Sequence, residues 1–293
     1  MPDKEFKQIV ILSGKGGTGK TTITAGLAGL IDSKVVIDCD VDAANLHLVL
    51  RPEVVNSYNY YGGKKAAIDS ILCTQCGKCV NACRFDAIKD FKVDPLSCEG
   101  CGFCYRMCPE NAIRFEPVLS GTYFECNLPD KSKFYYARLT PGEGNSGKLV
   151  SEIKKRALKN MSYGTEWVII DGPPGIGCPV NASLSAADYA VIVTEPTLSG
   201  LHDLKRLVEL LGTFKIPSGI IINKYDLNEN ITSRIFKYAE SLNIPVLGSI
   251  PFNQLFVEYL IHGKNLIEEN EKIHREFLSI LKKIEIQFSI YVN

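Results

Sequence analysis

The sequence lacks both a net charge and a long apolar run. Its 293 residues carry 33 lysine and arginine side chains against 33 aspartate and glutamate side chains, a balance that argues against bulk electrostatic attachment to nucleic acid. No apolar run approaches the roughly 20 residues that a spanning helix needs, and the N-terminal residues do not resemble a secretory signal. We therefore expect a cytoplasmic protein that binds no nucleic acid and no membrane.

Cysteine, by contrast, is abundant and clustered. Eight of the 11 cysteines fall between Cys73 and Cys108. In the reducing cytosol, such a cluster is expected to bind a metal or redox centre rather than to form disulfides.

Short runs rich in valine and isoleucine alternate with helix-like stretches outside the cysteine block. The strand candidates are residues 8–12, 34–37, 167–170, 190–193, 219–222 and 246–250. The helix candidates are residues 20–31, 146–159, 201–211, 231–242 and 272–284. Near-continuous apolar strands separated by helices predict an α/β fold, in which a doubly wound, mostly parallel sheet is covered on both faces.

The strand–helix alternation stops at the cysteine block and resumes near Ser146. The simplest interpretation is a small α+β domain over residues 61–120, inserted into an α/β domain of residues 1–60 and 121–293. The block contains an internal repeat, because C-x₂-C-x₂-C-x₃-C occurs at 73–83 and again at 98–108.

A glycine-rich segment directly after the first strand candidate fits the pattern G-x-x-x-x-G-K-[ST]. Backbone N–H groups of such a loop surround phosphates, and the helix that follows adds a favourable dipole. Lys20 should reach the β- and γ-phosphates, and the Thr21 hydroxyl should bind Mg²⁺. The predicted nucleotide-binding residues of this loop are Gly14, Lys15, Gly16, Gly17, Thr18, Gly19, Lys20, Thr21 and Thr22. A second match at 142–148 has Leu149 where the hydroxyl is needed, so we interpret it as a helix-capping loop.

The run K-G-G-T-G-K-T-T at 15–22 resembles the deviant phosphate loop of the MinD/ParA class of ATPases. This resemblance implies that ATP or ADP binds with Mg²⁺. It also implies a nucleotide-sandwich homodimer, in which Lys15 reaches the phosphates of the partner subunit. Such a cation would neutralise charge in the transition state, alongside Lys20.

Two further segments resemble the switches of this class. D-x-D-x-x-x-x-N-L begins at Asp38, which implies that Asp40 orients the attacking water and that Asp38 supports Mg²⁺ or the loop. D-x-P-x-G begins at Asp171, which implies that this carboxylate holds Mg²⁺ through water. Asn223 follows a strand candidate at the position where the class holds adenine.

The two cysteine runs resemble the bacterial two-cluster ferredoxin, in which the fourth cysteine of each run ligates the other cluster. The resemblance implies one [4Fe–4S] cluster on Cys73, Cys76, Cys79 and Cys108, and a second on Cys98, Cys101, Cys104 and Cys83. The first run departs from the pattern, because Arg84 stands where proline is usual. Zinc remains the competing interpretation, since C-x-x-C pairs also form zinc sites.

Cys178 lies seven residues beyond Asp171. In the nitrogenase iron protein, a member of the same class, a cysteine at this offset ligates a cluster shared by two subunits, which implies a thiol at the dimer interface here. A small buried thiol with no such role is the alternative.

Taken over the whole chain, the resemblance implies an ATPase that couples nucleotide state to electron transfer through two clusters, with a redox or iron–sulfur protein as partner. A maturation ATPase that carries a cluster or metal is the alternative, and a positioning ATPase is a third hypothesis that leaves the cysteine block unexplained. The apolar stripe of the last helix predicts packing on the sheet rather than on a membrane; its residues are Ile273, Phe277, Ile280, Leu281 and Ile284.

Overall fold

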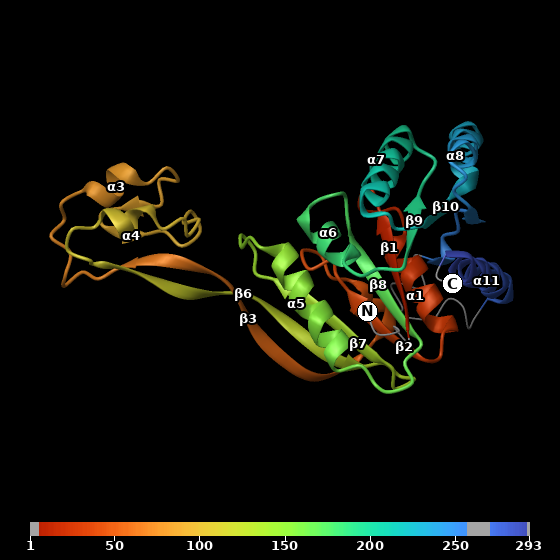
Figure 1. Cartoon of the computed structure of the whole chain (residues 1–293), viewed down its shortest axis with the longest axis horizontal. Coiled ribbons are helices and arrows are strands. Elements are labelled where there is room, and N and C mark those ends of the chain that lie inside the picture. Colours follow the sequence, from red (N-terminus) through yellow and green to blue (C-terminus); the bar gives the residue numbers. More distant parts are fainter. Residues whose placement is uncertain (1–5, 257–269, 292–293) are drawn as a thin grey trace. The chain divides into compact units, whose positions relative to one another are not determined.

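A computed structural model describes residues 6–256 and 270–291, and the chain divides into two compact units (Figure 1). The first unit comprises Met1–Ser57, Tyr123–Arg138 and Ser146–Asn293. The second comprises Tyr58–Thr122 and Leu139–Asn145. The predicted insert of residues 61–120 lies within the second unit, which also takes the short segment 139–145.

Nine strands of the described chain form one sheet in the order β11-β10-β9-β1-β8-β2-β7-β6-β3. Their bounds are β1 Lys7–Ser13, β2 Lys34–Asp38, β3 Glu53–Ile68, β6 Ile113–Asn127, β7 Lys133–Leu139, β8 Trp167–Pro174, β9 Tyr189–Thr194, β10 Ser218–Asn223 and β11 Val246–Ile250. Every pairing from β11 to β7 is parallel. The predicted α/β fold with a mostly parallel sheet is therefore confirmed, and all six strand candidates are strands.

Helices cover the parallel part of the sheet. Their bounds are α1 Lys20–Leu30, α2 Leu46–Leu50, α5 Ser146–Lys159, α6 Cys178–Leu184, α7 Leu198–Phe214, η1 Tyr225–Leu227, α8 Glu229–Ser241 and α11 Glu271–Tyr291. On one face, Ile9 and Ile11 of β1 share a core with α1 and α11. Val10 lies between them and is also fully buried, so alternate side chains of β1 pack on opposite faces. On the sheet's other strands, α5 contacts β2, α6 contacts β8 and α7 contacts β9.

The last helix packs as its apolar stripe predicts. Ile273, Phe277, Ile280, Leu281 and Ile284 are all buried in the core of the first unit. Burial of one medium-sized apolar side chain stabilises a fold by about 1.5–3 kcal/mol, so this face is a substantial part of the core. None of the helices in the described ranges has the length and hydropathy that a bilayer crossing requires.

Three strands of this sheet, β3, β6 and β7, were not predicted. The first half of β3 is exposed from Glu53 to Asn59, so it carries no apolar run of the kind that marks a central strand. β7 is buried over Phe134–Ala137, yet its buried side chains are mostly aromatic rather than valine or isoleucine. An exposed edge strand and an aromatic strand therefore both escaped a search for β-branched runs.

The second unit shows its internal repeat in three dimensions. The two cysteine runs form matching short helices, α3 Lys78–Ala82 and α4 Phe103–Met107. Each helix follows a glycine with positive φ, 75° at Gly77 and 81° at Gly102, a conformation that glycine adopts without steric cost. A small hairpin of β4 Ile88–Lys89 and β5 Lys92–Val93 lies between them in the chain. An ion pair between Lys65 and Glu143 ties the segment 139–145 to this unit.

Candidate functional site

The phosphate loop joins β1 to α1 and has the backbone that its glycines predict. Gly17 and Gly19 have φ of 80° and 89°, which favours glycine. A Cβ at Gly19 would lie 2.2 Å from the side-chain nitrogen of Asn223. That nitrogen donates a hydrogen bond of 2.7 Å to the carbonyl oxygen of Thr18. Asn223 therefore lies directly against the loop, on the strand end where the sequence predicted it.

A cavity of about 990 Å³ opens beside this loop. Several predicted site residues line it: Gly16, Gly17, Thr18, Gly19, Lys20, Thr21, Thr22, Asp40 and Asn223. Its apolar lining includes Leu48, Val49, Pro251, Phe252 and Phe256. A polar loop facing apolar and aromatic side chains can hold a phosphate-bearing ligand with a flat heterocycle.

One hydroxyl in the loop is unsatisfied. Thr18 Oγ1 is buried and has no hydrogen-bond partner among the described residues. A buried polar atom without a partner costs about 1–3 kcal/mol. A ligand that bonds to this hydroxyl would remove that cost, so the observation fits a binding loop better than a structural turn.

Asp171 gathers three side chains from the start of α1. Lys20 Nζ lies 2.6 Å from Oδ1, the Thr21 hydroxyl donates to Oδ2 at 2.9 Å, and the Thr24 hydroxyl donates to Oδ1 at 2.8 Å. Lys20 and Asp171 are both buried. Burial alone would lower the pKa of Lys20, but the Asp171 carboxylate outweighs it and raises that pKa. Asp171 of β8 and the first five residues of α1 thus form one polar, charged cluster.

The first switch segment places its two acids differently. Asp40 lines the cavity, and its burial raises its pKa above the usual range. Asp38 is fully buried, and its oxygens accept hydrogen bonds from the backbone N–H of Asp40 at 3.0 Å and of Leu46 at 3.1 Å. Burial and the nearby Asp171 raise the pKa of Asp38 to about 7. Asp38 thereby holds the segment in place, while Asp40 faces the cavity.

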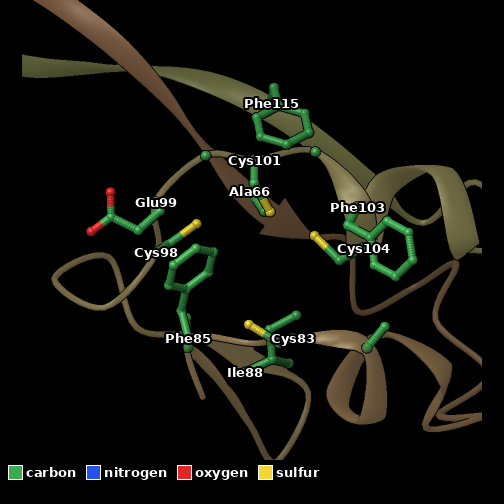
Figure 2. A pocket seen from close by; sticks show the side chains of 14 residues that line it. Ala66, Cys83, Phe85, Ile88, Cys98, Glu99, Cys101, Phe103, Cys104 and Phe115 are labelled. Atoms are coloured by element: carbon green, nitrogen blue, oxygen red, sulfur yellow. The ribbon is translucent and has the colours of Figure 1, made fainter.

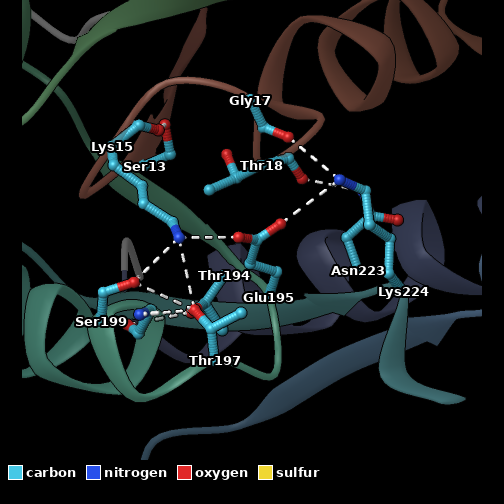
Figure 3. A network of polar contacts seen from close by, with 11 residues as sticks. Ser13, Lys15, Gly17, Thr18, Thr194, Glu195, Thr197, Ser199, Asn223 and Lys224 are labelled. Carbon is cyan, nitrogen blue, oxygen red and sulfur yellow. Dashed lines mark hydrogen bonds and ion pairs between the residues drawn. The ribbon is translucent and has the colours of Figure 1, made fainter. Parts of the chain in front are cut away.

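Lys15 is held within its own chain. Its Nζ lies 2.7 Å from a Glu195 carboxylate oxygen and donates to the hydroxyls of Ser199 at 2.9 Å and Thr197 at 3.3 Å (Figure 3). Lys224 Nζ approaches the other Glu195 oxygen at 3.3 Å. Burial opposes the ionisation of Glu195, but the two lysines outweigh it and lower the pKa of this carboxyl.

The cysteines of the second unit gather in two groups of four, and each group lines one cavity. The first cysteine site contains Cys73, Cys76, Cys79 and Cys108. The second cysteine site contains Cys83, Cys98, Cys101 and Cys104 (Figure 2). Each site therefore combines three cysteines of one run with the last cysteine of the other. Among the described residues, no three or more His, Cys, Asp or Glu side chains converge so that they could hold a single metal ion.

The three remaining cysteines lie elsewhere. Cys39 and Cys126 are buried, and burial raises the pKa of both thiols. Cys178 is exposed at the first residue of α6, directly after the second switch segment. The alternative of a buried structural thiol at Cys178 is therefore wrong for this chain, although exposure alone assigns the thiol no role.

Comparison with known proteins identifies the family. A domain family described as the CobQ/CobB/MinD/ParA nucleotide binding domain matches residues 9–267. This chain belongs to that family. The match explains why the phosphate loop, both switch segments and Asn223 lie at one edge of a parallel sheet, because that edge is the ligand side of such folds.

Relatives of the family extend over nearly the whole chain. An uncharacterized protein of Methanocaldococcus jannaschii is 36% identical over 95% of this chain and 96% of its own length. An uncharacterized ATP-binding protein of the same organism is 28% identical over 83% of this chain and 73% of its own length. The structure of MinD from Pyrococcus horikoshii, complexed with Mg-ADP, has a TM-score of 0.58 over 98% of both chains at 20% identity, which shows a shared fold.

Several residues of this MinD/ParA-family site were not predicted. Glu195, Ser199 and Lys224 form the contacts around Lys15, and Thr24 completes the cluster on Asp171. Glu195 directly follows β9, so its place after a buried strand was the available signal. The Thr24 hydroxyl lies one helical turn beyond Lys20, and only the position of β8 reveals its partner.

Proposed function

We propose that this chain binds and hydrolyses ATP with Mg²⁺, and that it couples its nucleotide state to electron transfer through two [4Fe–4S] clusters. The nucleotide part of the proposal rests on family membership and on the cavity beside the phosphate loop. The redox part rests on the two groups of four cysteines.

The nucleotide-binding roles follow from the contacts of the loop. The loop N–H groups and Lys20 would bind the phosphates, while Asn223 and the apolar lining would face the base. Lys20 would exchange its bond to Asp171 for one to a phosphate. Thr21 and Asp171 already share a hydrogen bond of 2.9 Å, so they are paired to hold Mg²⁺ directly or through water. Asp40 faces the cavity and would orient the attacking water.

The homodimer is the second element of the proposal. Lys15 does not line the cavity beside the phosphate loop of its own chain. Its Nζ instead contacts Glu195, Ser199 and Thr197. A lysine stored in this way can leave its partners and reach the phosphates of a second subunit. In that position it would stabilise charge that develops in the transition state, as an arginine finger does.

The donor chemistry of the cysteine sites fits iron–sulfur clusters. Thiolates are the usual ligands of such clusters, and a [4Fe–4S] cluster takes four of them. Each cavity presents four cysteines and no other side chain of comparable affinity for iron. Bound clusters would accept and donate single electrons at low potential.

The observation that carries the proposal is the crossed grouping of the cysteines, in which Cys108 joins the first three and Cys83 joins the second three. Anaerobic purification followed by iron, sulfide and zinc analysis tests it. We expect about eight iron atoms per chain, as two [4Fe–4S] clusters require. Stoichiometric zinc without iron would overturn the redox part and leave the nucleotide part intact.

One observation favours a second candidate, a maturation ATPase that carries a cluster or metal. Cys178 is exposed directly after the second switch segment, where a thiol could bind a labile metal together with its copy in a dimer. This candidate predicts additional iron that a Cys178→Ala variant loses. Iron content that the variant leaves unchanged favours electron transfer.

The likeness to MinD favours a third candidate, a positioning ATPase. Under this candidate, ATP would recruit the chain to vesicles or DNA. A pelleting assay with and without ATP tests it, since ATP-dependent pelleting is expected only of a positioning ATPase.

A further inference from the structure

The internal repeat relates the two cysteine sites residue by residue, so their differences can be read from matched positions. Cys73–Cys83 aligns with Cys98–Cys108, and the equivalent helices α3 and α4 begin at Lys78 and Phe103. Both of these residues line their own site. The equivalent lining positions therefore hold a lysine at the first cysteine site and a phenylalanine at the second.

The same substitution of polar by apolar residues recurs beyond the helices. Glu110, two residues after Cys108, lines the first site, and the equivalent Phe85, two residues after Cys83, lines the second. Phe115 adds a third ring to the second site, and the Glu99 carboxylate there points away from the sulfurs (Figure 2). The second site is thus lined by three phenylalanine rings, whereas the first is lined by one, Phe91.

A hydrogen bond to sulfur distinguishes the sites as well. The backbone N–H of Ala112 donates to Cys108 Sγ at 3.3 Å. The equivalent residues are Ala87 and Cys83, and the described chain has no corresponding bond between them. The next residue in the chain also differs between the two sites, because Pro109 follows Cys108 whereas Arg84 follows Cys83.

We propose that the two clusters are electronically unequal, with the cluster at the first cysteine site the more easily reduced. This rests on the proposed function, since it requires a [4Fe–4S] cluster at each site. Reduction adds one negative charge to a cluster. The N–H···S bond to Cys108 stabilises that charge at the first site, where the opposite charges of Lys78 and Glu110 offset each other. The second site has no equivalent bond, and its phenylalanine rings supply no compensating positive charge. Electrons would therefore collect at the first site, and the second site would be the stronger reductant.

The proposal predicts two separate one-electron steps when the anaerobically purified chain is titrated and followed by absorbance and electron paramagnetic resonance. We expect the two redox equilibria to differ by at least about tenfold, which corresponds to about 59 mV. Iron for two clusters with a single unresolved step would overturn this proposal and leave the proposed function standing. Zinc in place of iron would instead overturn the proposed function.

A matched exchange at the equivalent positions assigns the steps to sites. Lys78→Phe removes the cation from the first site and should shift only the easier step toward lower potential. Phe103→Lys adds a cation to the second site and should shift only the harder step toward higher potential, so that the double variant narrows the gap. Lys78→Gln serves as the milder variant, and iron content shows that each variant keeps both clusters. The assignment of reduction steps to sites would be overturned if Lys78→Phe shifted the harder step or Phe103→Lys shifted the easier one. Equal shifts of both steps in either variant would also overturn it.

Discussion

The ammonium group of Lys15 lies 2.7 Å from the Glu195 carboxylate, across 180 residues of sequence. Two hydroxyls and a second lysine complete this arrangement. Lys15 of the phosphate loop is therefore engaged within its own chain. A change of partner for this side chain is the first step that the proposed mechanism requires.

Replacing Glu195 by glutamine should weaken the fold in a pH-dependent way. The pKa of Glu195 is lowered in the folded chain, so its contribution is present above the ordinary glutamate pKa of about 4.3 and is lost as the pH falls through the lowered value. We expect Glu195→Gln to cost about 1 kcal/mol at pH 7, and the difference from the unsubstituted chain to vanish once the pH lies below the lowered pKa of Glu195. Urea unfolding at several pH values measures this. The exposed Glu240→Gln is the control, and a pH-independent loss would contradict the account.

Removal of the Lys15 ammonium should affect hydrolysis more than binding. We expect Lys15→Ala to lower the ATPase rate by about 10²–10³-fold, while the affinity for Mg-ATP changes by only a few-fold. Lys237→Ala, an exposed change on α8, is the matched control. An unchanged ATPase rate in Lys15→Ala would exclude the proposed role.

The cluster around Asp171 makes a prediction about stability. Asp171→Asn leaves the buried Lys20 ammonium without its carboxylate partner, and loss of one member of a buried ion pair costs about 3–5 kcal/mol. Thr24→Ala removes one hydrogen bond to the same carboxylate and should cost only about 1 kcal/mol. Denaturant unfolding without nucleotide compares the two. Equal and small losses of unfolding free energy in Asp171→Asn and Thr24→Ala would show that the ion pair does not order this site.

The phosphate loop should tolerate no side chain at Gly19. Its φ of 89° and the contact of 2.2 Å with Asn223 oppose a Cβ, so Gly19→Ala should destabilise the chain by about 1–3 kcal/mol and weaken nucleotide binding. Gly212 lies in α7 with open space around it. Gly212→Ala should therefore stabilise the chain by about 0.5–1 kcal/mol. Thermal unfolding with and without Mg-ADP tests both, and a neutral Gly19→Ala would refute the geometry.

The crossed cysteine grouping predicts the effect of a single ligand change. Cys83→Ala should remove the cluster at the second cysteine site and about half of the iron, although Cys83 belongs to the first sequence run. Cys126→Ala, at a buried cysteine outside both sites, should leave the iron content unchanged. Iron analysis after anaerobic purification distinguishes them. Loss of all iron in Cys83→Ala with a folded chain would contradict two separate sites.

The sequence was sufficient to predict the central sheet, because five of its strands are buried on both faces and carry valine- and isoleucine-rich runs. The edge strand β11 is only partly buried, but its short apolar segment was still recognisable. The phosphate loop could be located because its glycines and lysine recur at a spacing that only this kind of loop requires. Asn223 could be located because it stands at the end of a predicted strand. Three strands of this sheet were missed, and so were the two short strands of the β4–β5 hairpin. β3 is largely exposed, and β7 is buried through Phe134, Tyr135 and Tyr136 rather than through aliphatic residues.

The site residues that escaped prediction act through partners distant in sequence. Glu195 and Thr24 are ordinary residues in their local context, and they acquire roles only through Lys15 and Asp171. Spacing along the chain predicts backbone shape, but a contact across 147 residues, such as that of Thr24 with Asp171, depends on the order of strands in the sheet.

A redox titration of the anaerobically purified chain without nucleotide, with Mg-ADP and with Mg-ATP tests the coupling of nucleotide and clusters most directly. We predict that at least one reduction step shifts between the ADP and ATP states. Identical reduction curves in all three states, or the absence of any reducible iron, would contradict the account.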